Sequence, residues 1–195
     1  EQFAAEVKEF KTQGHEFSSE GYEHEYSFMY TKDQERESIQ KTVAAFEKVL
    51  GQKPTGYLSP GHASTPNTLD LVAEAGFVWW ADPLNSDNPY VVEARGRKVV
   101  VVPYNVPGCN DYSTYGTART PRDLLQLMKD QFDYLYWEGE QGYPKFFAFN
   151  LHPFVSGIPY RAKIIEEFIR YAQGHSKVWF AKRIEIANWW LEKGY

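Results

Sequence analysis

The chain has 195 residues, a formal net charge of -5 and 43% hydrophobic residues, which suffices for one sizeable core. The acidic balance and the lack of a Lys/Arg-rich run argue against nucleic acid or an anionic membrane as partners. No apolar run reaches the length of a membrane span, and the single cysteine, Cys109, excludes an internal disulfide and a Cys-based zinc cluster. We therefore expect one domain over residues 1–195.

The first half of the chain predicts helices that alternate with short strands. Thr31 and Gln34 have the spacing of a capping box, and Gly51 and Gly76 stand where helix-ending glycines are expected. The predicted helices cover residues 3–14, 31–51 and 65–76, and the predicted strands cover 15–18, 56–59 and 77–80.

The second half continues the alternation, except for one long predicted loop between Trp80 and Val99. Thr120 and Pro121 start a helix, and Gly174 ends another. The predicted strands are 99–102, 146–151 and 177–180, and the last two helices cover 162–172 and 184–191.

This order predicts the α/β class, with a parallel sheet and covering helices that form either an open sheet or a closed barrel. A complete barrel needs about eight strands and about 250 residues. Six strands preceded by a lone helix fall short of that number. If the fold is a barrel, we expect its first strand or strands to be missing from this chain.

Functional groups of parallel α/β folds gather at the C-terminal ends of the strands. Four segments follow predicted strands in this way: residues 18–26, 59–64, 81–90 and 152–161.

Glu20 and His24 lie in the first of these segments, four residues apart. Both side-chain types bind zinc or a similar divalent ion, but a catalytic zinc site takes about three protein ligands and this segment supplies two. The alternative is a solvated acidic loop, because Glu16, Glu23 and Glu25 are close in sequence.

His152 follows an apolar predicted strand, and a histidine there can act as a general acid near neutral pH. The alternative is a partly buried structural histidine. His62, on the second segment, can contact substrate or lie on a polar surface. Asp82, Asp87 and Tyr90, on the third, can make turns around Pro83 and Pro89.

The motifs together resemble the polysaccharide deacetylase superfamily over nearly the whole chain. The matching segments, in order, are 14–16 with 21–24, 56–60, 68–69 with 74–77, 151–154 with Gly157, Pro159 and Arg161, and 178–181 with 185–187. The branch that it resembles includes peptidoglycan deacetylase-like proteins, cyclic imidases and metal-independent allantoinases.

The resemblance implies a distorted (β/α) barrel of about seven strands and hydrolysis of a non-peptide C–N bond. Glu20 stands where the family has its first metal-binding histidine, and Leu58 stands where it has an active-site arginine. The family's first motif, an Asp-Asp sequence on the first strand, has no equivalent before Glu1. We expect either that the chain lacks its N-terminal strand or that a second polypeptide completes the barrel.

The predicted function is hydrolysis of an amide, a cyclic imide or an N-acetyl group. We assign His152 as the general acid, Glu20 or the missing aspartate as the base, and a backbone N–H near Gly61 as the oxyanion donor. The assigned metal ligands are Glu20 and His24, with zinc as the expected ion and a metal-independent mechanism as the alternative. The assigned substrate-binding residues are His62, Trp80, Tyr90 and Arg161.

Two alternatives remain open. One is a deacetylase of peptidoglycan or chitin, because Trp79, Trp80 and the Tyr-rich loop 104–115 would stack on sugars as well as on small amides. The other is a non-catalytic carbohydrate-binding or regulatory subunit of the same fold. We expect an oligomer. The sequence leaves the compartment open, with the cytoplasm favoured.

Overall fold

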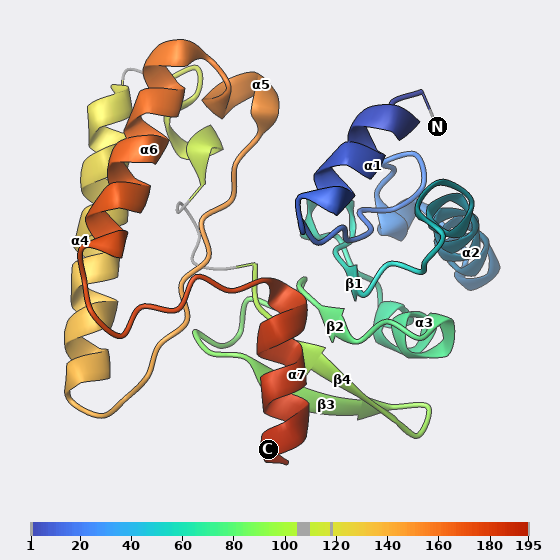
Figure 1. The fold of residues 1–195 in the computed structure, drawn as a ribbon. Coiled ribbons are helices and arrows are strands. Elements are labelled where there is room, and N and C mark those ends of the chain that lie inside the picture. Colours follow the sequence, from blue (N-terminus) through green and yellow to red (C-terminus); the bar gives the residue numbers. More distant parts are fainter. Residues whose placement is uncertain (1, 105–109, 118, 195) are drawn as a thin grey trace. The chain divides into compact units, whose positions relative to one another are not determined.

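The computed structural model describes residues 2–104, 110–117 and 119–194, in two compact units (Figure 1). The first unit comprises Glu1–Pro103 and Ala181–Tyr195, and the second comprises Tyr104–Phe180. Cys109 lies outside the described residues, as does most of the first half of the Tyr-rich loop. The single domain over 1–195 stays a prediction.

The first unit contains a mixed sheet of four strands in the order β1-β2-β4-β3. β1 (Gly56–Tyr57), β2 (Trp79–Trp80) and β4 (Arg97–Val101) are parallel, and Ser19 adds a parallel bridge to Tyr57 at the β1 edge. The mixed α/β fold with a mainly parallel sheet is therefore confirmed. Among the described residues the sheet is open, and the predicted number of about seven strands is not confirmed.

The prediction of one long loop between Trp80 and Val99 is wrong, because part of this segment forms the strand β3 (Tyr90–Ala94). β3 pairs antiparallel with β4. The turn between the two strands is Arg95–Gly96, and both residues have positive φ, 54° and 70°. Two-residue hairpin turns with positive φ at both positions match the twist of the flanking strands. The sequence did not signal it because arginine is unusual at the first of these positions.

The helices of the first unit are α1 (Ala4–Thr12), η1 (Ser27–Met29), α2 (Lys32–Leu50), η2 (Pro60–His62), α3 (Thr68–Ala75) and α7 (Arg183–Lys193). The predicted capping box of α2 is present, and Gly51 ends this helix in the left-handed conformation, with φ 67°. α1 forms as predicted but has no buried residue. α3 begins at Thr68 rather than Thr65, because the Thr65 hydroxyl donates to the buried Glu35 on α2.

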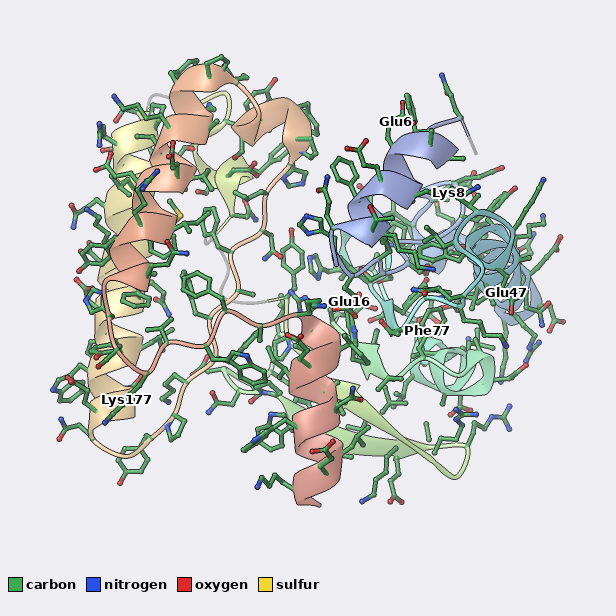
Figure 2. All side chains as sticks on the ribbon, in the orientation of Figure 1. Glu6, Lys8, Glu16, Glu47, Phe77 and Lys177 are labelled. Atoms are coloured by element: carbon green, nitrogen blue, oxygen red, sulfur yellow. The ribbon has the colours of Figure 1, made fainter. Side chains whose placement is uncertain are left out.

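The core of the first unit joins α2, α3 and the strands through Ile39, Leu71, Val72 and Val99. α7 packs on β2, β3 and β4. Glu16, labelled beside the start of α7 in Figure 2, accepts hydrogen bonds from the Trp79 indole (2.8 Å) and the Ile184 N–H (3.0 Å). One carboxylate therefore ties the last helix to the sheet.

The second unit is built on two long helices that lie side by side (Figure 1). Its elements are η3 (Asp111–Thr114), α4 (Pro121–Glu140), α5 (Pro153–Ser156) and α6 (Pro159–Gln173). The core between α4 and α6 contains Leu124, Leu125, Met128, Phe132, Ile164, Phe168 and Ala172.

The strands predicted at 146–151 and 177–180 are wrong, apart from one parallel bridge between Asn110 and Asn150. Phe147, Phe149 and Val178 instead pack against the helical core. Their apolar pattern therefore reflects contact with helices rather than strand pairing. None of the described helices is both long and apolar enough to cross a membrane.

Candidate functional site

In the first unit, three chain segments leave the sheet at the same end of its strands. Ser19 forms a parallel bridge with β1, and β1 pairs parallel with β2. The residues after each of them therefore emerge at the C-terminal ends of the strands. Glu20, the Ser59–His62 segment and Asp82 occupy these places. The strand order therefore brings together three of the segments that the sequence singled out.

Glu20 and His24 form an exposed pair at this edge, with Oε1 and Nε2 3.3 Å apart. His24 has φ 59°, a left-handed conformation that few residues other than glycine adopt. Gly21, between them, also has positive φ, and a Cβ there would lie 2.9 Å from Pro60 Cγ. The Glu20–His24 loop therefore lies directly against η2.

His62 lies on the neighbouring loop and is half-buried, again with positive φ, 55°. A Cβ on Gly61 would lie 2.3 Å from the Tyr26 ring, so the His62 loop and the loop after Glu20 are in contact. Burial lowers the pKa of His62, the nearby Glu20 carboxylate opposes this effect, and the Arg183 guanidinium adds to it. The neutral imidazole is thus favoured.

Asp82 is a buried carboxylate rather than a turn residue on the surface. Its Oδ1 accepts the Ser59 N–H at 2.7 Å, and its Oδ2 accepts the Trp80 indole N–H at 2.6 Å. Burial raises the pKa of Asp82, while these donors act in the opposite direction. Asp82 fixes the loop that carries His62 and orients Trp80. The Tyr90 hydroxyl, in turn, donates to Asn85 Oδ1 at 2.7 Å.

The first unit supplies two of the ligands expected for a divalent ion. Glu20 and His24 have suitable donor types, but the part of the chain that the structure describes contains no group of three or more His, Cys, Asp or Glu placed to hold a metal. Catalytic zinc sites use about three protein ligands. The described residues therefore do not complete such a site.

In the second unit, His152 is paired with a buried aspartate that the sequence did not single out. His152 Nδ1 lies 2.6 Å from Asp111 Oδ1, and Asp111 is fully buried. Asp111 Oδ2 accepts the His152 backbone N–H and the Ser156 hydroxyl, both at 2.7 Å. Three donors therefore compensate a carboxylate that has lost its water.

This arrangement defines the role of each imidazole nitrogen. A carboxylate can only accept, so Nδ1 carries a hydrogen toward Asp111 and Nε2 is left to exchange a proton with a ligand. The His152 side chain is 35% exposed, which leaves it accessible. A histidine oriented by a buried carboxylate is a common form of general acid or base.

Arg161 is buried beside the turn that carries Asp111. Its guanidinium donates to the Thr114 hydroxyl and to the Thr114 carbonyl, both at 3.2 Å. It thereby holds η3, and its assignment to substrate binding stays a prediction. A groove of about 660 Å³ runs along α6 from His152; its lining includes Leu151, Pro153, Ile165, Ile169 and Arg170.

The structure thus groups the sequence-predicted residues into two sets. Glu20, His24, His62, Trp80 and Tyr90 belong to the first unit, and His152 and Arg161 belong to the second. Asp82 and Asp111 are buried aspartates; the sequence favoured neither, because Asp82 could be read as a turn residue and Asp111 was not singled out. The position of Asp82 directly after an apolar segment is a signal for it, whereas Asp111 has none in its neighbouring residues.

Comparison with known proteins supports the resemblance to polysaccharide deacetylases. The family model described as "Polysaccharide deacetylase" matches residues 1–80. A peptidoglycan deacetylase of Helicobacter pylori is 26% identical over 226 residues, covering 99% of this chain and 76% of the relative. These matches support the similarity of the chain to the polysaccharide deacetylase (NodB-like) superfamily.

Solved structures show a similar fold over nearly the whole chain. The crystal structure of Puue allantoinase matches with a TM-score of 0.90 and 30% identity, over 99% of this chain and 64% of that one. A structure described as a probable polysaccharide deacetylase from Pseudomonas aeruginosa matches with a TM-score of 0.88 and 34% identity, over 98% and 64%. The chain spans just under two thirds of these structures. The relatives indicate the predicted enzyme class, an amidohydrolase or deacetylase.

Proposed function

We propose that the chain carries catalytic groups for hydrolysis of a non-peptide C–N bond, in an amide, a cyclic imide or an N-acetyl group. The observation that carries this proposal is the hydrogen bond between His152 Nδ1 and the buried Asp111. It holds the imidazole in one orientation and occupies Nδ1, so that Nε2 is left to exchange a proton. The similarity to polysaccharide deacetylases supports the same class of reaction.

His152 is the general acid in this proposal. Water adds to the carbonyl carbon, the C–N bond breaks, and the imidazolium gives its Nε2 proton to the departing nitrogen. Asp111 orients the ring throughout by its contact with Nδ1. Nitrogen is a poor leaving group as an anion, so this protonation is the step for which a positioned acid is most effective.

We propose Glu20 as the carboxylate that accepts a proton from the attacking water, with a further carboxylate beyond this chain as the alternative. An N–H near Gly61 would donate to the oxyanion, since Pro60 has no N–H. Glu20 and His24 are also the proposed ligands of a divalent ion, zinc by donor type. Such an ion would polarise the carbonyl and acidify water; a metal-independent route is the alternative.

His62, Trp80, Tyr90 and Arg161 are the residues proposed to bind substrate. The first three offer flat aromatic faces, which suit contact with a planar, neutral amide. Arg161 would contribute by holding the Asp111 turn through Thr114. An oligomer, and a second polypeptide that completes the fold, remain part of the proposal and are tested by the mass of the native protein.

A second candidate function is deacetylation of an N-acetylated polysaccharide. The relative from Helicobacter pylori that aligns with nearly the whole chain is a peptidoglycan deacetylase, which favours this alternative. The chemistry assigned to His152 would be unchanged, because an N-acetyl group is also an amide.

The test is a hydrolysis assay of the native protein on succinimide and on di-N-acetylchitobiose, with and without added zinc. We expect turnover of at least one substrate and its loss in His152→Ala, while His15→Ala, an exposed histidine on another loop, keeps the wild-type rate. Full activity of His152→Ala would sink the assignment. Sugar binding without any turnover would instead support a non-catalytic subunit.

A further inference from the structure

The groove along α6 lies within the second unit, and the proposed general acid, His152, is part of its lining. Its volume is about 660 Å³. One wall is formed by residues of the segment 151–157, and the other by residues of α6 between Ala162 and Gln173. α5, which follows His152, leads through Ile158 into α6 (Figure 1). The groove therefore extends from the proposed acid, near the start of α6, along most of this helix.

The walls of the groove are mainly aliphatic. Leu151 and Pro153 belong to one wall, and Ala162, Ile165 and Ile169 belong to the other. Leu151 is 43% exposed and Ile169 is 41% exposed, so part of this apolar surface is in contact with water. Removal of such surface from water is the main source of affinity for an apolar ligand.

α6 has two neighbouring apolar stripes, and only one of them packs in the core. Ile164 belongs to the stripe that packs against α4. The stripe beside it, Ala162, Ile165 and Ile169, lines the groove. Residues three and four positions apart lie on one face of a helix, so this wall is straight. The lining residues of α6 span 162–173, which corresponds to about 16 Å along the helix axis.

The charged side chains of α6 that line the groove are paired with each other. Glu166 and Arg170, one turn apart, form an ion pair in which Oε1 and Nη2 lie 2.7 Å apart. An ionised ligand would compete with this pair, whereas an uncharged chain leaves it intact. The lining therefore favours a neutral, aliphatic occupant.

The groove is open close to His152 because the lining residues next to α5 are small. They are Ser156, Gly157 and Ala162. The Ser156 hydroxyl already donates to Asp111 at 2.7 Å. A Cβ on Gly157 would lie 2.4 Å from the backbone oxygen of Pro153, so the turn after α5 requires glycine. A chain can therefore enter the groove directly from the side of the imidazole.

We propose that the groove binds a straight aliphatic chain attached to the scissile nitrogen, so that the substrates are N-acyl derivatives of aliphatic amines. This inference rests on the proposed function, in which His152 gives a proton to the departing nitrogen. The substituent on that nitrogen is then the part of the substrate closest to the groove. Water adds to the carbonyl carbon and the C–N bond breaks, which yields a carboxylic acid and the aliphatic amine.

The experiment measures KM and kcat for N-methyl-, N-butyl- and N-hexylacetamide. We expect KM to fall about two- to fourfold for each added methylene, or about a hundredfold over the series, as the chain is buried. The value of kcat should change little, because the chain is bound equally in the ground state and the transition state. A KM that is independent of chain length would overturn the inference.

An isomer with the same atoms tests which side of the amide occupies the groove. N-Methylheptanamide has the long chain on the carbonyl carbon, whereas N-hexylacetamide has it on the nitrogen. We expect KM to be at least about tenfold higher for N-methylheptanamide, because only the chain on the nitrogen begins beside His152. An equal or lower KM for N-methylheptanamide would contradict the proposal.

Ala162→Leu fills the groove near His152 at an exposed helix position, where leucine is well tolerated. It should reduce the hundredfold span of KM between N-methyl- and N-hexylacetamide to less than about tenfold. Lys163→Leu is the matched control, because Lys163 is the next residue of α6, is exposed and is not among the residues that line the groove. It should keep the full span. The same reduction in both variants would overturn the inference.

Binding of an alcohol that cannot be hydrolysed separates this inference from the proposed function. The wild type should bind 1-hexanol more tightly than ethanol in a calorimetric titration, and Ala162→Leu should remove most of this difference. Such binding in a protein that hydrolyses no amide would support the groove and refute the proposed function. Hydrolysis of the acetamides with no dependence on chain length would refute the groove and leave the proposed function standing.

Discussion

Each unit of the protein buries one aspartate near a candidate histidine, and the two aspartates are used differently. Asp82, in the first unit, accepts from a backbone N–H and an indole, so it fixes the positions of loops. Asp111, in the second, accepts from an imidazole and thereby fixes the side chain that can move a proton. The comparison separates a carboxylate that supports a site from one that belongs to its chemistry.

The candidate catalytic side chains of the two units also differ in how firmly they are held. Glu20 and His24 form a pair whose side chains are 50% and 66% exposed, and such pairs contribute about 0–1 kcal/mol to stability. His152 is bound to a fully buried partner. In the second unit, the His152 ring is therefore oriented by a buried carboxylate before substrate binds. In the first unit, the positions of Glu20 and His24 depend on the backbone conformation of their loop.

The largest expected effect is that of His152→Ala. Loss of a positioned general acid typically lowers the rate by about 10² to 10⁴. We expect such a fall in kcat, measured on the preferred amide, together with a loss of about 1–3 kcal/mol in the free energy of unfolding, because the buried Asp111 loses one of its three donors. A decrease of less than threefold would place the acid elsewhere.

Asp111→Asn comes next, because it changes both the orientation of His152 and the hydrogen bonds of a buried group. We expect kcat to fall at least about tenfold and the free energy of unfolding to fall by about 1–3 kcal/mol, because one NH₂ group would face a former donor. Asp82→Asn is the matched variant: urea unfolding should show a loss of similar kind, with a smaller effect on kcat. Equal effects of both variants on kcat would contradict the assignment of a structural role to Asp82 and of a role in orienting His152 to Asp111.

The pH dependence of stability should reveal Asp82. Burial raises the pKa of Asp82 in the folded state, so folding favours its protonated form. Its contribution to stability is therefore complete below the ordinary aspartate pKa and is lost as the pH rises through the raised value. The stability of the wild type relative to Asp82→Asn should fall across this window and then level off. A relative stability that rises with pH would contradict the assignment.

Ser156→Ala should have the smallest effect of the set. It removes one of three donors to Asp111 and leaves the bond to His152. We expect a loss of about 0.5–1.5 kcal/mol in unfolding free energy and a change in kcat of a few-fold, with Ser156→Thr restoring much of both. A fall in kcat as large as that of Asp111→Asn would mean that the hydroxyl contributes directly.

The sequence predicted the features that depend on neighbouring residues. The capping box of Thr31 and Gln34 and the left-handed Gly51 are signals within one helix. The spacing of Glu20 and His24 indicated two candidate ligands, whereas their contact depends on a loop in which Gly21 and His24 have positive φ. Family resemblance pointed to His152. The fold class followed from the alternation of helices and strands.

What the sequence did not predict depends on contacts between distant residues. Asp111 bonds to His152 across 41 positions, and no local pattern signals such a partner. The apolar run that contains Phe147 and Phe149 predicted a strand because burial against helices and burial in a sheet select the same residues. The sequence did not predict β3, because its hairpin turn has Arg95 at a position that usually favours glycine or asparagine.

The hydrogen bond between Glu16 and Ile184 also bears on the order of folding. The first unit is assembled from two segments separated by the whole second unit, and this bond joins residues 168 positions apart. Residues 104–180 are continuous, so on the ribosome they can fold as soon as they emerge. The first unit, although its synthesis begins earlier, can close only after α7 is made. The packing of α7 on the sheet, which the Glu16 hydrogen bond holds, is therefore expected to form last, by a slow, long-range contact.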